Sequence, residues 1–227
     1  MTVTFHPPPQ MLPEAALAPW HDVPVALVVD RAPGARQIDP AIRPLRPAGT
    51  QPRLFGRAVT VRVTPPDFGA MLHALDLAGA GDVLCVDAGG DAATAMIGEI
   101  LSGHLRRRGV AGLVVDGAVR DVATLAGWSD FAVFARHVTP RGPASALHGE
   151  LNASVQIGGA CVDPGDLIMG DDDGAVCLPA AAVAAGLPPV REKAALEAEW
   201  ERRLSHGKSA AAVFGLEPPA WADSSQH

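Results

Sequence analysis

The chain contains little of what several common catalytic mechanisms require. It has no tyrosine, and its only lysines are Lys193 and Lys208 near the C-terminus. An imine-forming enzyme needs a desolvated lysine in its site, and neither lysine lies in an apolar run that predicts a core strand. The cysteines Cys85, Cys161 and Cys177 form no CxxC pair, and each lies in an apolar run. The sequence therefore argues against imine catalysis and a zinc site, and predicts core thiols in a reducing compartment.

Long apolar runs and basic patches are also scarce. No run of about eighteen apolar residues is present, and residues 1–10 lack the charged and apolar regions of a signal peptide, so we expect a cytoplasmic protein without a membrane partner. The formal net charge is −7, and the one basic run, at 106–108, ends a predicted helix, where it offsets the helix dipole. We therefore expect no nucleic-acid partner.

Apolar residues are abundant, at 48% of 227 residues, which is enough for a sizeable core. Strands and helices are predicted to alternate along the first two thirds of the chain. The predicted strands span 57–63, 83–87, 112–116 and 131–135. Over 153–178, short apolar runs divided by glycine-containing turns predict antiparallel strands. The order predicts a layered α/β domain whose sheet is partly parallel and partly antiparallel.

The remaining segments divide the chain into four parts. Residues 1–22 are rich in proline and predict an extended arm with one short helical turn, and residues 23–179 form the α/β domain. Within that domain, 23–32 fits either a buried strand or a short helix that opens at Pro24, and 137–152 is expected to be loop. A helical segment over 180–206 precedes a flexible tail over 207–227. We expect the C-terminal helix to pack on a neighbouring subunit, because few neighbours remain for it in its own chain.

The segment 98–121 holds the candidate site. It predicts a helix, a buried strand and a loop that carries Arg120 and Asp121. A helix start offers free N–H groups that bind a small anion such as a carboxylate. Two starts fit the sequence: at Gly98 these groups are free, whereas a start at Ala92 would consume them inside the helix. With a start at Gly98, the segment predicts an anion binder beside a possible metal ligand, as a 2-oxo acid and a divalent cation would require.

Other polar motifs predict less. Asp171, Asp172 and Asp173 followed by Gly174 fit a β-turn better than a calcium loop, because no glutamate is placed to close the loop. None of the eight histidines forms an HxH or HExxH motif. His137, which follows a predicted strand, is better placed near a site than His104 in the predicted helix.

Four segments together resemble the RraA-like family. They are GEIL, GVAGLVVDGAVRD, FAVFAR and GGACVDPGDLIMGDDDGAVCLP. The family includes class II pyruvate aldolases acting on 4-hydroxy-4-methyl-2-oxoglutarate and 4-carboxy-4-hydroxy-2-oxoadipate, and a branch that regulates ribonuclease E. The resemblance implies a swivelling β/β/α domain that assembles into homotrimers or homohexamers.

The resemblance also implies a role for each site residue. The backbone amides of Gly98, Glu99, Ile100 and Leu101 would bind the pyruvyl carboxylate. Arg120 would bind the 2-oxo oxygen, and Asp121 would ligate Mg²⁺ or Mn²⁺. The side chain of Glu99 would lie near the metal waters. The implied activity is metal-dependent cleavage of a 4-hydroxy-2-oxo di- or tricarboxylic acid to pyruvate and a second oxo acid, with oxaloacetate decarboxylation beside it. A non-catalytic regulator and another metal-dependent lyase or hydratase remain as alternatives. His137 stands where the family commonly has glycine, which leaves the contacts to the distal part of the substrate open.

Overall fold

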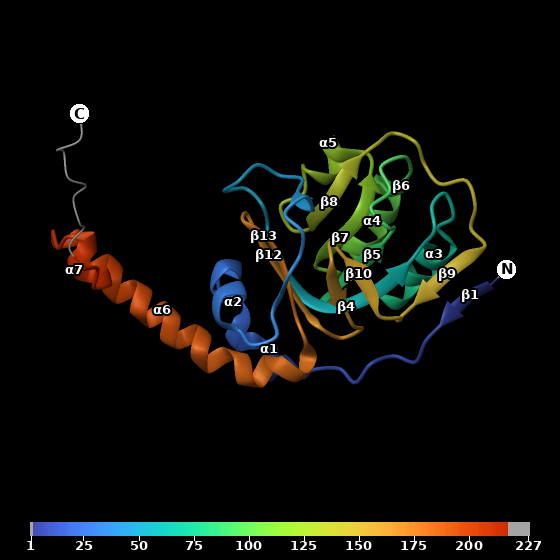
Figure 1. The fold of residues 1–227 in the computed structure, drawn as a ribbon. Helices are drawn as coiled ribbons and strands as arrows, with labels where there is room; N and C mark the ends of the chain where they lie inside the picture. Colours follow the sequence, from blue (N-terminus) through green and yellow to red (C-terminus); the bar gives the residue numbers. More distant parts are fainter. Residues whose placement is uncertain (1, 218–227) are drawn as a thin grey trace, which may run out of the picture.

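A mixed sheet forms the centre of the molecule (Figure 1). The computed structural model describes residues 2–217. Four parallel strands lie side by side in the sheet, in the order β4, β5, β7 and β8. Their bounds are Leu54–Arg62, Asp82–Asp87, Gly112–Val119 and Ala132–Val138. Together with the antiparallel strands that flank them, these strands confirm the predicted α/β class.

Antiparallel strands extend this sheet on both sides. β12 (Leu167–Asp171) pairs with β4, and the hairpin partner β13 (Gly174–Leu178) pairs with β2 (Arg36–Gln37). At the other edge, β3 (Arg43–Pro44) pairs with β8. The three aspartates at 171–173 form the β12–β13 turn, as predicted.

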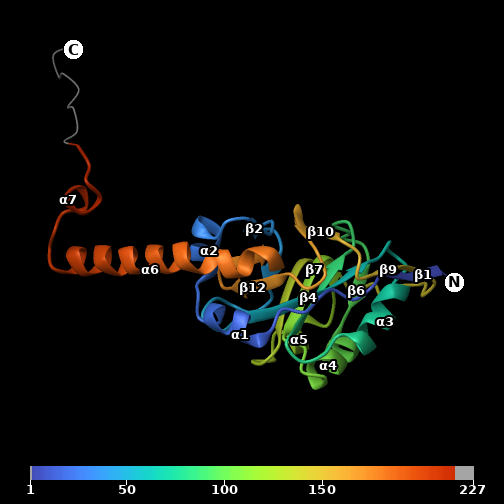
Figure 2. The same cartoon turned by 90° about the horizontal axis from the view of Figure 1, so that it is seen from below.

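The two faces of the parallel strands are covered by different layers (Figure 2). Side chains alternate along β5, so Leu84 and Val86 pack in the cluster under the helices, whereas Val83 and Cys85 pack in the opposite cluster. The helices of the first layer are α3 (Gly69–Leu77), α4 (Glu99–Arg107) and α5 (Val122–Leu125). The second layer is the hairpin of β10 (Val155–Ile157) and β11 (Ala160–Val162). The loops that follow the carboxyl ends of the strands lie between these layers, where α/β sheets bind ligands.

The N-terminal arm is more ordered than its composition predicts. β1 (Thr2–Phe5) pairs in parallel with β9 (His148–Leu151), which also pairs with β4. The prediction that 137–152 is entirely loop is therefore wrong. The pairing uses the free edge of β9, which a sequence pattern of only four residues does not reveal.

A third core cluster joins the arm to the C-terminus. It contains the predicted turn α1 (Glu14–Leu17), the 3₁₀ turn Ala18–Trp20 and α2 (Val25–Arg31). Of the two possibilities for 23–32, the helix with Pro24 as its N-cap is correct. A second 3₁₀ turn, Ala180–Ala182, leads into α6 (Val183–Ser205).

Helix α6 is one continuous helix that includes both Pro188 and Pro189. Its first half packs on the core through Val183, Gly186 and Val190, and its second half extends away from the body (Figures 1 and 2). α7 (Ala210–Phe214) follows, and the Phe214 ring packs 5.0 Å from that of Trp200. Part of the segment predicted as a flexible tail is thus helical, and its residues 218–227 lie outside the described part. Packing of α6 on another subunit stays a prediction.

The cysteines are all free thiols, but Cys161, which was predicted to lie in the core, is only partly buried. Cys85 and Cys177 are buried, and burial raises the pKa of both thiols, which keeps them protonated and unreactive. Among residues 2–217, every helix is too short or too polar to cross a lipid bilayer.

Candidate functional site

Helix α4 begins immediately after Gly98, which settles the choice between the two predicted starts. Upstream, β6 (Ala95–Ile97) pairs with the end of β7, and the Ala95 N–H donates to the Arg141 carbonyl (2.8 Å). These tertiary hydrogen bonds outweigh the helical propensity of the alanines around Ala92. The N–H groups of Ile100 and Leu101 donate to no acceptor within residues 2–217. They are free to bind an anion.

Glycine is required at position 98 by a close approach of the chain. A Cβ on Gly98 would lie 2.3 Å from Asp121 Oδ2 and 2.7 Å from Arg120 Cγ, although the backbone there is ordinary extended chain. Any side chain would therefore push the Arg120–Asp121 loop away from the start of α4. The glycine brings the anion-binding amides and the charged pair into one site.

The backbone of the charged loop is strained in a way that fixes the carboxylate. Asp121 adopts the left-handed region (φ 58°, ψ 36°), which is uncommon outside glycine and costs on the order of 1 kcal/mol. In this conformation its Oδ2 accepts a hydrogen bond from the Glu99 N–H (2.9 Å), and Arg120 Nε lies 3.6 Å from the same oxygen. Asp121 Oδ1 forms no hydrogen bond within the described residues. One oxygen thus orients the carboxylate, and the other is available to a ligand.

Glu99 supplies a second carboxylate at the same helix start. The Thr124 hydroxyl donates to Glu99 Oε2 (3.3 Å), so the first turn of α5 orients this side chain. No cluster of three or more His, Cys, Asp or Glu side chains suited to a metal occurs in residues 2–217. Two carboxylates without imidazole or thiolate fit Mg²⁺ or Mn²⁺, which retain several waters, and do not fit zinc.

A pocket of about 310 Å³ opens beside the charged pair. The Arg120–Asp121 pair forms one end, and the Arg120 guanidinium lies close to the backbone of Gly142. The remaining lining comes from α3, β6, the start of α4 and the loop before β9. The residues are Phe68, Leu72, Ala95, Met96, Ile97, Gly98, Ile100, Leu101 and Pro143. Five of the six residues predicted from the sequence line this pocket, and Glu99 does not. The Glu99 amide was also predicted to bind the substrate carboxylate, but it donates to Asp121 Oδ2 instead.

The fold agrees with comparisons to known proteins. A family model described as RraA-like, Aldolase/RraA, matches residues 25–177. The chain belongs to the RraA-like family. A relative from Halalkalibacterium halodurans, named "Putative 4-hydroxy-4-methyl-2-oxoglutarate aldolase", is 32% identical over 82% of this chain and 87% of its own length.

Solved structures of RraA-like proteins show the same fold with different names. The RNA-processing inhibitor RraA from Thermus thermophilis is 31% identical, with a TM-score of 0.63 over 70% of this chain and 93% of that chain. An uncharacterized protein from Pseudomonas syringae is 22% identical, with a TM-score of 0.76 over 90% and 99% of the two chains, and shows the fold alone. Lyase and regulator names therefore both occur among relatives of this RraA-like chain.

The loop that closes the pocket of this RraA-like chain is held by Asp67, which the sequence analysis missed. Its buried carboxylate accepts hydrogen bonds from the Ser145 hydroxyl and from the N–H groups of Gly69, Leu147 and His148, the last three at 2.9 Å. Burial alone would raise the pKa of Asp67, but these hydrogen bonds outweigh it and hold the pKa well below its usual range. An aspartate just before a predicted helix was the available signal.

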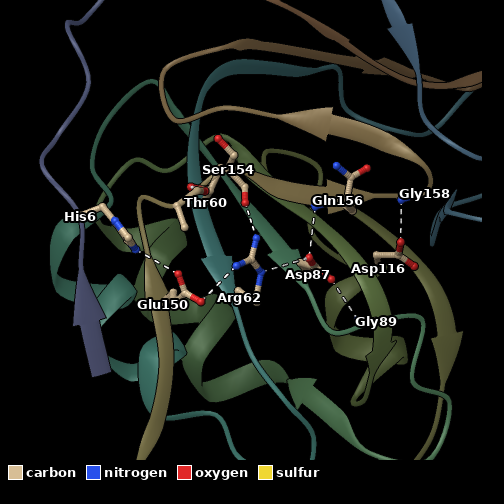
Figure 3. Close-up of polar contacts among 11 residues, drawn as sticks. His6, Thr60, Arg62, Asp87, Gly89, Asp116, Glu150, Ser154, Gln156 and Gly158 are labelled. Carbon is tan, nitrogen blue, oxygen red and sulfur yellow. Dashed lines mark hydrogen bonds and ion pairs between the residues drawn. The ribbon is translucent and has the colours of Figure 1, made fainter. Parts of the chain in front are cut away.

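A second charged cluster lies at the ends of the parallel strands and is closed on itself (Figure 3). Arg62, Asp87 and Asp116 stand side by side in register on β4, β5 and β7. Arg136 Nε donates to Asp116 Oδ1 (2.6 Å), and the Gly158 N–H donates to Asp116 Oδ2 (2.6 Å). Hydrogen bonds to Asp116 and Asp39 raise the pKa of Arg136.

The same cluster ties distant segments to the sheet. Asp87 accepts from the Gln156 N–H (3.1 Å), and Arg62 donates to Glu150 (3.1 Å), whose other oxygen lies 3.0 Å from His6 Nε2. Figure 3 shows these contacts running from the arm to the β10–β11 hairpin. Because its carboxylates are already bonded, this cluster holds the architecture together and offers little to a ligand.

Two expectations near the site need correction. The strand predicted over 112–116 is longer in the structure, because β7 continues through Gly117 to Val119, with a register shift against β8 between Val115 and Ala118. His137 lies within β8, opposite Ala118, and is not among the residues that line the pocket.

Proposed function

We propose that the chain is a divalent-metal-dependent lyase that cleaves a 4-hydroxy-2-oxo acid to pyruvate and a second oxo compound. One observation carries the proposal: the free amides of α4, Arg120 and the oriented Asp121 carboxylate meet at one end of one pocket. The relative named as an aldolase supports the reaction class. The substrate is a small 2-oxo acid, and homotrimeric or homohexameric assembly stays a prediction from the family resemblance.

Each group at this end of the pocket has a distinct task in substrate binding. The N–H groups of Ile100 and Leu101 receive the C1 carboxylate, and the Arg120 guanidinium donates to the 2-oxo oxygen. Asp121 Oδ1 would hold Mg²⁺ or Mn²⁺ directly, and Glu99 would hold its waters. When bound, such a cation polarises the 2-oxo group and offsets negative charge on its oxygen.

The cleavage itself is a retro-aldol reaction. Glu99 accepts the proton of the C4 hydroxyl through a water molecule, and the C4 oxygen becomes a carbonyl as the C3–C4 bond breaks. The electron pair of that bond forms the enolate of pyruvate, and Arg120 stabilises the negative oxygen. Removal of one preorganised donor of this kind costs about 3 kcal/mol. Protonation at C3 then gives pyruvate.

A regulator of RNA processing is the second candidate, because a relative with that name shares 31% identity. Two observations favour the lyase. Asp121 is held in a costly backbone conformation with one oxygen free, and Glu99 is oriented beside it. A protein that only binds another macromolecule has no use for that strain.

Pyruvate release from oxaloacetate tests the proposal directly, because decarboxylation passes through the same enolate. With Mg²⁺ or Mn²⁺ we expect pyruvate to form faster than in the same solution without protein, and in excess EDTA we expect no increase over that solution. Release that continues unchanged in EDTA would contradict a metal-dependent lyase, and absence of release from oxaloacetate and from 4-hydroxy-2-oxo acids would contradict a lyase of any kind. Product analysis separates cleavage from hydration.

A further inference from the structure

We infer that the N-terminal strand β1 positions the Arg120 guanidinium, acting through the loop that joins β8 to β9 (residues 139–147). The inference rests on the proposed function and deepens it, because Arg120 is the residue assigned to the 2-oxo oxygen. β1 lies before residues 25–177, which the family model matches. A segment outside the matched part of the chain thus acts on the proposed site.

The Arg120 guanidinium lies directly over Gly142 in this loop. A Cβ on Gly142 would overlap Arg120 Nη1 and would lie 3.4 Å from Arg120 Cζ. The backbone at Gly142 is outside the left-handed region, so space and not conformation requires glycine there. Within the described residues, the guanidinium has one ion pair, in which Nε lies 3.6 Å from Asp121 Oδ2. The place of the Nη1 end therefore depends on where the loop holds Gly142.

Leu147, at the end of the same loop, is held from two directions. Its N–H donates to Asp67 Oδ2 (2.9 Å), and its carbonyl accepts from the Thr2 N–H of β1 (2.8 Å). The Leu147 side chain is 43% exposed, so packing contributes little to its position. β1 thus supplies one of the two backbone hydrogen bonds that fix this end of the loop.

β1 reaches the loop because it pairs along the whole of β9 (Figure 1). The register begins with Thr2 opposite His148. At the other end, the His6 N–H donates to the Leu151 carbonyl (2.9 Å). Without β1, the carbonyl groups on this edge of β9 would face solvent, and the loop before β9 would be free to fray.

Hydrogen bonds hold β1 more than burial does. Of its four residues, Val3 alone packs against the core cluster under the helices, and the other three side chains are exposed. The consecutive prolines at 7–9 favour an extended chain, so the strand loses little conformational freedom when it docks. β1 is therefore an element that can leave β9 without opening the core.

A variant of the full chain that cannot pair β1 with β9 tests the inference. Thr4 lies between Thr2 and His6 at the strand period of two, so its N–H faces β9 as theirs do. Val3→Asp combined with Thr4→Pro removes the apolar anchor and this donor. Thr4→Ala keeps both and is the matched control. Hydrogen exchange over residues 148–151 shows whether β1 has left.

Phenylglyoxal modification measures the freedom of Arg120 without any ligand, because the reagent attacks accessible guanidinium groups and mass spectrometry assigns the site. Arg120 is expected to react at least about threefold faster in the combined variant than in Thr4→Ala. Arg106, which is paired with Asp130, is the internal reference and should react equally in both. Equal or slower modification of Arg120 in the combined variant would overturn the inference.

Gly142→Ala tests the step from the loop to Arg120 with β1 in place. The methyl group would push the guanidinium aside, so calorimetric titration with Mg²⁺ should give a Kd for pyruvate at least about tenfold higher. Gly79→Ala is the control, because nothing lies within 4 Å of a Cβ there. In the combined β1 variant the same Kd should rise about fivefold, close to the loss of one hydrogen bond. Wild-type affinity in Gly142→Ala would show that the loop does not set Arg120, and the inference would be wrong.

Failure of the inference can be told apart from failure of the proposed function. If the wild-type chain neither binds nor releases pyruvate, the proposed function is wrong, and modification of Arg120 still decides whether β1 positions it. If pyruvate is released but Arg120 reacts alike with β1 docked and detached, the inference alone is overturned.

Discussion

Two Arg–Asp pairs lie near the carboxyl end of β7 and differ in almost every physical respect. The Arg136 and Asp116 side chains are 18% and 11% exposed and meet at 2.6 Å. The Arg120 and Asp121 side chains are 42% and 41% exposed, and their closest approach is 3.6 Å. Asp116 uses both carboxylate oxygens within the chain, whereas Asp121 leaves one free.

The comparison separates a structural pair, whose carboxylate oxygens are both hydrogen-bonded within the chain, from a pair that leaves one carboxylate oxygen available to a ligand. Removing one partner from a largely buried, hydrogen-bonded pair costs about 3–5 kcal/mol, because the other charge is stranded. An exposed pair contributes roughly 0–1 kcal/mol to stability. The strained backbone at Asp121 is therefore not offset by the contact between Arg120 and Asp121, and the ligand site that we propose would account for it. Variants of the two pairs should accordingly fail in opposite ways.

The largest effect is expected for Asp121→Ala. Loss of the free carboxylate oxygen should lower kcat/KM for metal-dependent pyruvate release at least about a hundredfold. The melting temperature should fall only slightly, because alanine tolerates the left-handed region less well than aspartate and the exposed Glu99 N–H loses its acceptor, but no core contact is lost. Asp130→Ala removes the partner of Arg106 on the same surface and is the matched control. Comparable activity in Asp121→Ala and Asp130→Ala would contradict a role for the Asp121 carboxylate in pyruvate release.

Arg120→Lys is expected to follow, with a loss in kcat/KM of roughly a hundredfold. An ammonium group keeps the charge but cannot present the planar fork of donors toward the 2-oxo oxygen. The loss should fall mainly on kcat, because the stabilised charge develops during cleavage. A variant with raised KM and normal kcat would show that Arg120 only binds the substrate.

Asp116→Ala should show the opposite pattern. We expect about 1–3 kcal/mol lower unfolding free energy in urea, because the Gly158 N–H loses its acceptor and Arg136 keeps only its more exposed partner, Asp39. The folded fraction should keep its kcat within about twofold. Full stability with lost activity would place this pair in the site and abolish the distinction.

The smallest effect is expected for Asp67→Asn. The substitution keeps the shape of the side chain but replaces one carboxylate oxygen by an NH₂ group, which faces hydrogen-bond donors of the surrounding chain. At pH 7 the variant should be less stable by about 1–3 kcal/mol. The folded-state pKa of Asp67 lies below its unfolded value of about 4, so its stabilisation is present above that value and is lost as pH falls below it. Urea unfolding should therefore show the difference from wild type shrinking below about pH 4. A constant difference at all pH values would assign the effect to packing.

The sequence located the charged loop and the core strands because those signals are local. Apolar runs marked β4, β5, β7 and β8, and the resemblance assigned Arg120 and Asp121 their roles. The start of α4 was only half predictable, since local propensity favours an earlier start and pairing of β6 with β7 decides for Gly98.

Contacts between distant segments were beyond local patterns. Asp67 meets the segment around Ser145, and Asp116 meets Arg136, only because of strand register and loop closure. The uninterrupted α6 is a further case. Its two prolines fall in the half that packs on the core, and burial there outweighs their low propensity for a helix interior.

The pocket is assembled from two separable stretches of chain, and this has an evolutionary consequence. Its reactive end, in the function that we propose, comes from the short continuous segment 98–121, where Glu99 and Asp121 are held by hydrogen bonds. Its far wall comes from α3 and the loop around Pro143, which carry no part of the reactive end. Substitutions in the wall can therefore retune which molecules are admitted while the reactive end is inherited intact. Such modularity allows one scaffold to diversify among related acids by changes at a few positions.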